Sequence, residues 1–100
     1  MLQRNLFDLT IQERFEDYHE RHPEVYGYLV SFARDLRRKG FNRYSIKTLG
    51  ERLRWHMELD RDDCDFKLND HFHSRYARKL MADYPDEFGD FFELRELKSN

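Results

Sequence analysis

Apolar residues recur at helical spacing through the first part of the chain. A capping box at Thr10–Glu13 predicts the start of a helix over residues 11–22. Pro23 suits the first position of a second helix, over 23–39, and Gly40 stands where a left-handed cap would end it. One broad apolar stripe marks the core side of this second helix: Val25, Leu29, Phe32, Ala33 and Leu36.

Two more helices are predicted in the second part of the chain. Ser45 is a good N-cap for a helix over 46–58, and Asn69 or Asp70 can cap a helix over 70–83. Both segments have an apolar side at helical spacing, which predicts that each packs on a common core. Those sides consist of Ile46, Leu49, Leu53 and Met57 in one helix, and of Phe72, Tyr76, Leu80 and Tyr84 in the other.

Two residues depart from the simple pattern of the helix over 46–58. Gly50 falls near the apolar side, where the lack of a side chain favours close packing against a neighbour. Trp55 points nearly opposite to that side. Trp55 therefore either packs beneath a terminal segment of the chain or anchors a partner protein.

Polar and apolar residues alternate in Asp65–Leu68, which predicts a short strand. Phe91–Arg95 fits either a second strand paired with the first or a final helical turn, and we favour the strand. The expected fold is mainly α: one domain over residues 1–100, with four helices and a small two-stranded β element, resembling a winged helix. Residues 1–9 are expected to form a mobile or docking segment, because Leu6 and Phe7 precede the first capped helix.

Composition favours a cytoplasmic protein. The single cysteine, Cys64, excludes an internal disulfide and is typical of a reducing compartment. No apolar run is long enough to span a membrane, and the first residues lack the apolar segment of a signal peptide. A small helical chain of this kind can also be a homodimer, and the sequence leaves that open.

Charge is distributed unevenly, although the formal net charge is only −2. Residues 34–54 hold eight basic and two acidic side chains, and residues 55–66 hold one basic and five acidic ones. A protein that is nearly neutral overall can still present a one-sided field to a polyanion. The alternative is that the two blocks pair with each other in the fold.

The favoured hypothesis is non-catalytic binding of nucleic acid, of the helix-turn-helix or winged-helix type and with double-stranded DNA as the target. The helix over 70–83 would enter the major groove, and the basic residues before it would contact phosphates. The predicted contacts are Asn69, His71, Ser74, Arg75, Arg78 and Lys79 in the groove-entering helix, and Arg43, Lys47, Arg52 and Arg54 before it.

The alternative hypothesis is a protein-interaction module that modulates another protein. Trp55 would be its anchor, and Leu6 and Phe7 would add apolar contacts from the N-terminal segment. Tryptophan is enriched among the residues that dominate the energetics of protein interfaces.

Enzymatic and metal-dependent functions have weaker sequence support. Asp65 and Lys67 have the carboxylate-x-lysine spacing of some metal-dependent nucleases, but that pattern is short and such enzymes need a larger sheet. Cys64, His71 and His73 do not match the spacing of a zinc site. We therefore expect no catalytic residue, metal or cofactor.

Four segments resemble a family of small proteins encoded in bacteriophage and bacterial genomes. They are FEDYHERHPEVY, RYSIKTLGERLRWH, FKLNDHFHSRYARKLM and FFELREL, and together they extend from about Arg14 to Ser99. The family has no established activity, so the resemblance implies no catalytic residue and no ligand. It implies a complete, small and soluble protein, and by analogy a phage regulator that binds DNA or inhibits a host protein.

Overall fold

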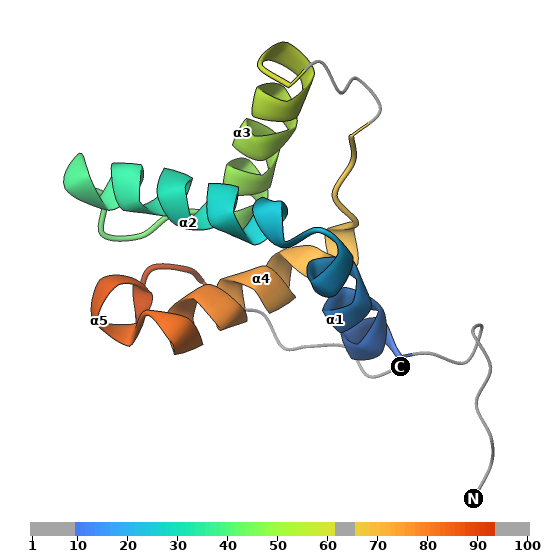
Figure 1. The fold of residues 1–100 in the computed structure, drawn as a ribbon. Coiled ribbons are helices and arrows are strands. Elements are labelled where there is room, and N and C mark those ends of the chain that lie inside the picture. Colours follow the sequence, from blue (N-terminus) through green and yellow to red (C-terminus); the bar gives the residue numbers. More distant parts are fainter. Residues whose placement is uncertain (1–9, 62–65, 94–100) are drawn as a thin grey trace, which may run out of the picture.

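The computed structural model describes residues 10–61 and 66–93 (Figure 1). These residues form five helices: α1 (Ile11–Arg21), α2 (Pro23–Arg38), α3 (Ile46–Leu59), α4 (Asp70–Asp83) and the short α5 (Pro85–Phe88). The four long helices match the four that the apolar pattern predicts, with ends that differ by at most one residue. The mainly α fold class is confirmed.

Local hydrogen bonds explain why the helices begin and end at these residues. Thr10 and Glu13 form a reciprocal capping box, in which each side chain accepts a bond from the other residue's backbone N–H. The side chains of Ser45 and Asn69 cap α3 and α4 in the same manner, by accepting backbone N–H groups of the first turn. Gly40, just after α2, has a φ of +98°, a left-handed conformation that favours glycine.

Helix α4 lies at the centre of the fold, in contact with α1, α3 and α5, while α2 packs on α1 and α3. Its Tyr76 is fully buried, and the Phe15 ring of α1 meets the Tyr76 ring edge-on at a centroid distance of 4.7 Å. The centroid of the Phe72 ring lies 5.8 Å from that of the same Phe15 ring. Burial of each such side chain contributes about 1.5–3 kcal/mol, so this aromatic group accounts for much of the packing of α1 on α4.

Helices α3 and α4 approach each other closely at Gly50. A Cβ atom placed on Gly50 would lie 2.5 Å from Nε2 of His73 in α4, closer than packed atoms allow. His73 is nearly buried, and its Nδ1 lies 3.3 Å from the Asp70 carbonyl oxygen. The predicted role of Gly50 in close packing is therefore confirmed.

The predicted two-stranded element is not supported, because the described residues contain no strand. Phe91 and Phe92 are buried beside Phe88 instead. The Tyr44 backbone N–H donates to the Phe91 carbonyl oxygen at 2.9 Å, and Tyr44 forms a single parallel bridge with Phe92. These bonds attach the end of the described chain to the loop before α3, so a winged-helix wing is not seen there; Asp65, Leu94 and Arg95 lie outside the described residues.

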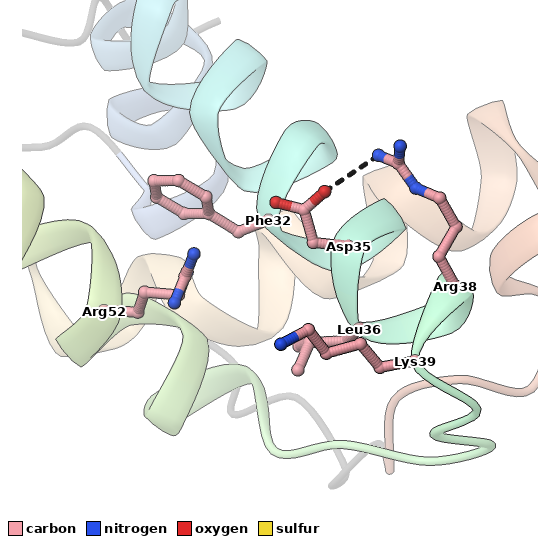
Figure 2. A pocket seen from close by; sticks show the side chains of 6 residues that line it. All are labelled: Phe32, Asp35, Leu36, Arg38, Lys39 and Arg52. Atoms are coloured by element: carbon pink, nitrogen blue, oxygen red, sulfur yellow. Dashed lines mark hydrogen bonds and ion pairs between the residues drawn. The ribbon is translucent and has the colours of Figure 1, made fainter.

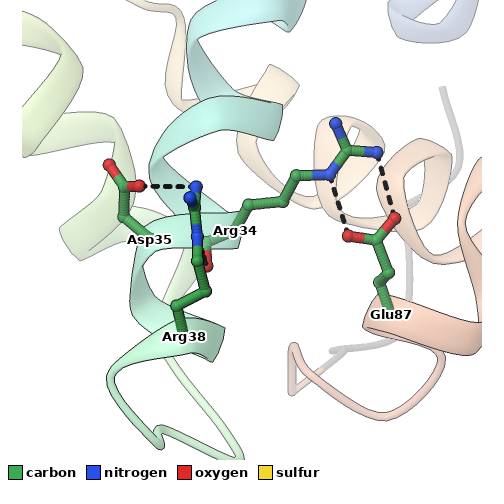
Figure 3. A network of polar contacts seen from close by, with 4 residues as sticks. All are labelled: Arg34, Asp35, Arg38 and Glu87. Atoms are coloured by element: carbon green, nitrogen blue, oxygen red, sulfur yellow. Dashed lines mark hydrogen bonds and ion pairs between the residues drawn. The ribbon is translucent and has the colours of Figure 1, made fainter.

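An ion pair fixes α5 against α2. The guanidinium of Arg34 donates two hydrogen bonds to the Glu87 carboxylate, at 2.8 and 3.0 Å (Figure 3). These bonds hold the pKa of Glu87 below its usual value. A second ion pair lies on the surface of α2, where the Arg38 guanidinium donates to the Asp35 carboxylate at 2.8 Å (Figure 3).

Candidate interaction surface

Helix α4 does not present the exposed basic face that the sequence pattern predicts. Ser74, Arg75, Arg78 and Lys79 are all half-buried, while Asn69 and His71 at the start of the helix are exposed. The reason is that α4 is enclosed by its neighbours α1, α3 and α5, with α2 resting on α1 and α3. The recognition role of α4 stays a prediction, with less support than the sequence pattern gives it, because these basic side chains are not fully exposed.

The polar groups of α4 are used within the fold. Arg75 donates to the Gln12 side chain of α1 at 3.1 Å and to the His71 carbonyl oxygen at 3.2 Å. Lys79 pairs with Asp83 at 3.2 Å, and its Nζ lies 5.1 Å from the centre of the Tyr26 ring. The side-chain oxygen of Asn69 accepts the His71 backbone N–H at 2.8 Å, although Asn69 itself is exposed.

Asp83 connects these groups to α2. The Tyr26 hydroxyl donates to the Asp83 carboxylate at 2.7 Å, and this bond, assisted by Lys79, lowers the pKa of Asp83. Burial and the same bond raise the pKa of the Tyr26 hydroxyl. A carboxylate that is held ionised in this way keeps Lys79 engaged at neutral pH.

The second predicted basic group lies between residues 43 and 54, and only part of it is free. Arg54 is paired with Glu51 at 3.0 Å and with Glu58 at 3.2 Å, and these partners raise its pKa. Arg43 and Lys47 are exposed and form no ion pair with any described residue. The predicted set of ten contacts is thus not one surface.

Trp55 is exposed on the outer side of α3. Its exposed fraction is 60%, and that of Leu59, one turn later, is 73%. The opposite side of the helix is fully occupied, because Leu53 and Met57 are buried in the core. Trp55 therefore does not pack beneath a described segment, while the predicted partners Leu6 and Phe7 lie outside the described residues.

Arg52 belongs to the same outer side as Trp55 and Leu59, because residues spaced by three and seven positions share one side of a helix. Figure 1 shows the C-terminal end of α3 reaching away from the other labelled helices. Helix α3 is nevertheless attached to α2 there, since the His56 ring lies 4.5 Å from the Tyr28 ring. The outer side of α3 is thus a firmly held, solvent-facing strip.

A depression of about 410 Å³ lies between α2 and α3, next to this strip. Its lining comes from the C-terminal half of α2, from the C-cap residue that follows it and from one residue of α3: Phe32, Asp35, Leu36, Arg38, Lys39 and Arg52 (Figure 2). The sequence pattern assigns Phe32 and Leu36 to the core, but both are only half-buried. Phe32 lies at the edge of the apolar stripe, which was an available signal. Leu36 lies in the middle of the stripe, so the sequence pattern gave no such signal for it.

Metal binding by residues 10–61 and 66–93 would depend on their His, Asp and Glu side chains. No cluster of three or more His, Cys, Asp or Glu side chains in these ranges is arranged to hold a metal ion. Lys67 of the nuclease-like pattern is exposed in an irregular segment, and its partner Asp65 lies outside the described residues.

Among the helices described, none has the length and apolar character needed to cross a membrane. Comparisons of the chain with protein-family models, with curated proteins and with solved structures gave no significant match. The resemblance to phage-encoded proteins and the cytoplasmic location stay predictions.

Proposed function

We propose that the chain is a non-catalytic protein-interaction module that binds a partner protein through the outer side of α3. One observation carries this proposal: Trp55 and Leu59 stand exposed next to each other on a helix whose other side is fully packed. Large apolar side chains that gather on a surface are typical of interaction sites. Tryptophan supplies a large contact area that dominates many interfaces.

The attachment of α3 supports a binding role. Leu49, Leu53 and Met57 anchor the helix in the core, so the outer side chains are displayed on a rigid support. A rigid site loses little conformational entropy when a partner binds, and affinity improves accordingly. By contrast, Arg75 and Lys79 of α4 already have partners inside the fold, which weakens the support for DNA binding through that helix.

Selection of a displayed random-peptide library on the purified protein tests the proposal. We expect enriched peptides whose affinity falls at least about tenfold, or 1.4 kcal/mol, in the Trp55→Ala variant. Phe41→Ala is the matched control, because Phe41 is an exposed aromatic residue in the loop before α3. Failure to enrich any peptide, or equal binding by the wild type and Trp55→Ala, would refute the proposal.

Trp55 is the only tryptophan, so its fluorescence reports directly on the surface. In the free protein we expect red-shifted emission that acrylamide quenches efficiently, because the indole is 60% exposed. Peptide binding should shift the emission to the blue and protect it from the quencher. A blue-shifted, protected indole in the dilute free protein would mean that the site is already covered.

Nucleic-acid binding is a second candidate, with a changed location. Arg43 and Lys47 are exposed without an ion pair to a described residue, and Lys39 is exposed close by in the chain. These cations lie around the N-terminal end of α3 instead of on α4. Their number supports weak, sequence-independent contact with phosphates.

A further inference from the structure

The depression between α2 and α3 has an apolar base and two cations at its edges. Phe32 and Leu36 supply the apolar surface, and with Lys39 they follow one side of α2 at spacings of four and three residues. Figure 2 shows Arg52 reaching from α3 toward α2, and the Lys39 side chain extending back toward α3. The two charges thus face the same space from opposite helices.

Arg52 is held in a position that suits a carboxylate. Its guanidinium lies over the Phe32 ring, with the central carbon 4.7 Å from the ring centre. A cation–π contact uses the face of the guanidinium and leaves the N–H groups at its edge available. Those N–H groups form the planar fork that matches a carboxylate with two parallel hydrogen bonds.

The charges that line the depression do not cancel. Asp35 is the one acidic residue of the lining, and it is already paired with Arg38 at 2.8 Å. Lys39 and Arg52 have no acidic partner among the described residues. The depression therefore keeps two uncompensated positive charges beside an apolar surface.

We propose that this depression, together with Trp55 and Leu59, binds an acidic amphipathic segment of the partner protein. This inference rests on the proposed function and specifies the chemistry of the partner. An apolar side chain of the segment lies against Phe32 and Leu36, and a nearby carboxylate lies between Lys39 and Arg52. The rest of its apolar side covers Trp55, as an amphipathic helix does in a groove.

A peptide fits this surface better than a nucleic acid does. Acidic side chains occur throughout it, with Asp35 in the depression and Glu51 and Glu58 along α3. Asp35 is paired with Arg38, while Glu51 and Glu58 share the single Arg54, so this group on α3 keeps one net negative charge. That charge disfavours a continuous chain of phosphates more than a segment that carries a few charges. Leu36 and Leu59 are aliphatic, and the Phe32 ring already lies against the Arg52 guanidinium. Among the residues assigned to this surface, a base could therefore stack only on Trp55.

The displayed-library selection provides the test, with a synthetic copy of the most enriched peptide as the probe. We expect enriched sequences to combine Asp or Glu with large apolar residues. Affinity for the probe should fall about tenfold or more in Lys39→Glu/Arg52→Glu, and less in Lys39→Gln/Arg52→Gln. The control is Arg14→Glu/Lys67→Glu, which reverses two exposed charges elsewhere. Circular dichroism of each variant verifies folding.

A charge-swapped peptide, with Lys in place of its acidic residues, should recover affinity for Lys39→Glu/Arg52→Glu. Peptides that require Trp55 but are not acidic, or that ignore the charge reversal, overturn this inference and leave the proposed function standing. Loss of any dependence on Trp55 overturns both. A third outcome is that a single-stranded oligonucleotide displaces the peptide, and that its binding requires Trp55 and Arg52. That outcome overturns both the proposed function and this inference in favour of nucleic-acid binding.

Discussion

Gly50 lets α3 and α4 approach each other closely because it has no side chain. Replacement of glycine by alanine inside a helix normally stabilises it by about 0.5–1 kcal/mol. Gly50 should behave in the opposite way, because the new Cβ would meet the His73 ring at 2.5 Å. The His73 side chain is only 12% exposed, so little open space is left for its ring to move into. We expect Gly50→Ala to lower the free energy of unfolding by about 1–2 kcal/mol.

Gly27 is the matched control for that substitution. It lies exposed in α2, and a Cβ built on it has no atom within 4 Å. Gly27→Ala should therefore raise the free energy of unfolding by about 0.5–1 kcal/mol. Urea denaturation of both variants provides the comparison. A gain in stability for Gly50→Ala similar to that for Gly27→Ala would show that α3 and α4 are not in close contact there.

At the scale of helices, the sequence was sufficient wherever local chemistry decides the outcome. The caps at Thr10, Ser45 and Asn69 and the left-handed Gly40 mark helix ends through hydrogen bonds and backbone conformation within a few residues. The apolar stripe then gives the core side of each helix. These features explain why the four long helices were predicted with nearly correct ends.

The environment of α4 could not be predicted in the same way. A stripe of apolar residues shows which side faces the core, but it does not show how many other helices flank it. Arg75 and Lys79 flank the stripe, and their long side chains carry the charge to partners on α1 and within α4. A half-buried basic residue with a partner inside the fold has the same neighbours in the sequence as an exposed basic residue, so the sequence does not distinguish the two.

For a related reason, the short α5 was not predicted and the chain after it was predicted as a strand. Phe91 and Phe92 are both apolar and adjacent, so their local pattern fits a strand or a turn. Tertiary contacts decide: both rings are buried beside Phe88, and the backbone bonds to Tyr44, a residue far away in the sequence. The site between α2 and α3 depends on equally distant pairs, above all Phe32 and Arg52.

The pairing of α5 with α2 predicts how stability depends on pH. Arg34 lowers the pKa of Glu87 below its usual value of 4.5, so the unfolded chain takes up this proton first on acidification. The contribution of the ion pair is therefore present above pH 4.5 and is lost as the pH falls through the lower pKa of the folded state. Glu87→Gln should be less stable than the wild type at neutral pH and equally stable in strong acid.

Urea denaturation across this pH range measures the effect, which should be modest because both side chains are 41% exposed. Glu20→Gln is the control, since Glu20 is exposed on α1 and pairs with no described residue. A difference between Glu87→Gln and the wild type that persists unchanged in strong acid would assign the effect to packing instead of charge.

At the scale of the whole molecule, the arrangement of charge separates the two candidate functions. The formal net charge of −2 opposes binding of a long polyanion, and a positive field arises only where cations lack acidic partners. Among the described residues these cations lie mainly along the end of α2, the following loop and the start of α3. A surface of this extent can contact few phosphates at once.

Duplex DNA should therefore bind weakly, if at all, and only at low salt. With about three phosphate contacts, the slope of log K against log salt concentration should be about −3. Arg43→Glu/Lys47→Glu should abolish any retardation of the duplex in a gel, because both cations are exposed. Arg75→Ala should leave retardation unchanged and instead lower stability, since Arg75 connects α4 to α1. Loss of DNA binding in a fully folded Arg75→Ala protein would reinstate α4 as the contact helix, because a side chain that serves only the fold has no other means of acting on a distant duplex.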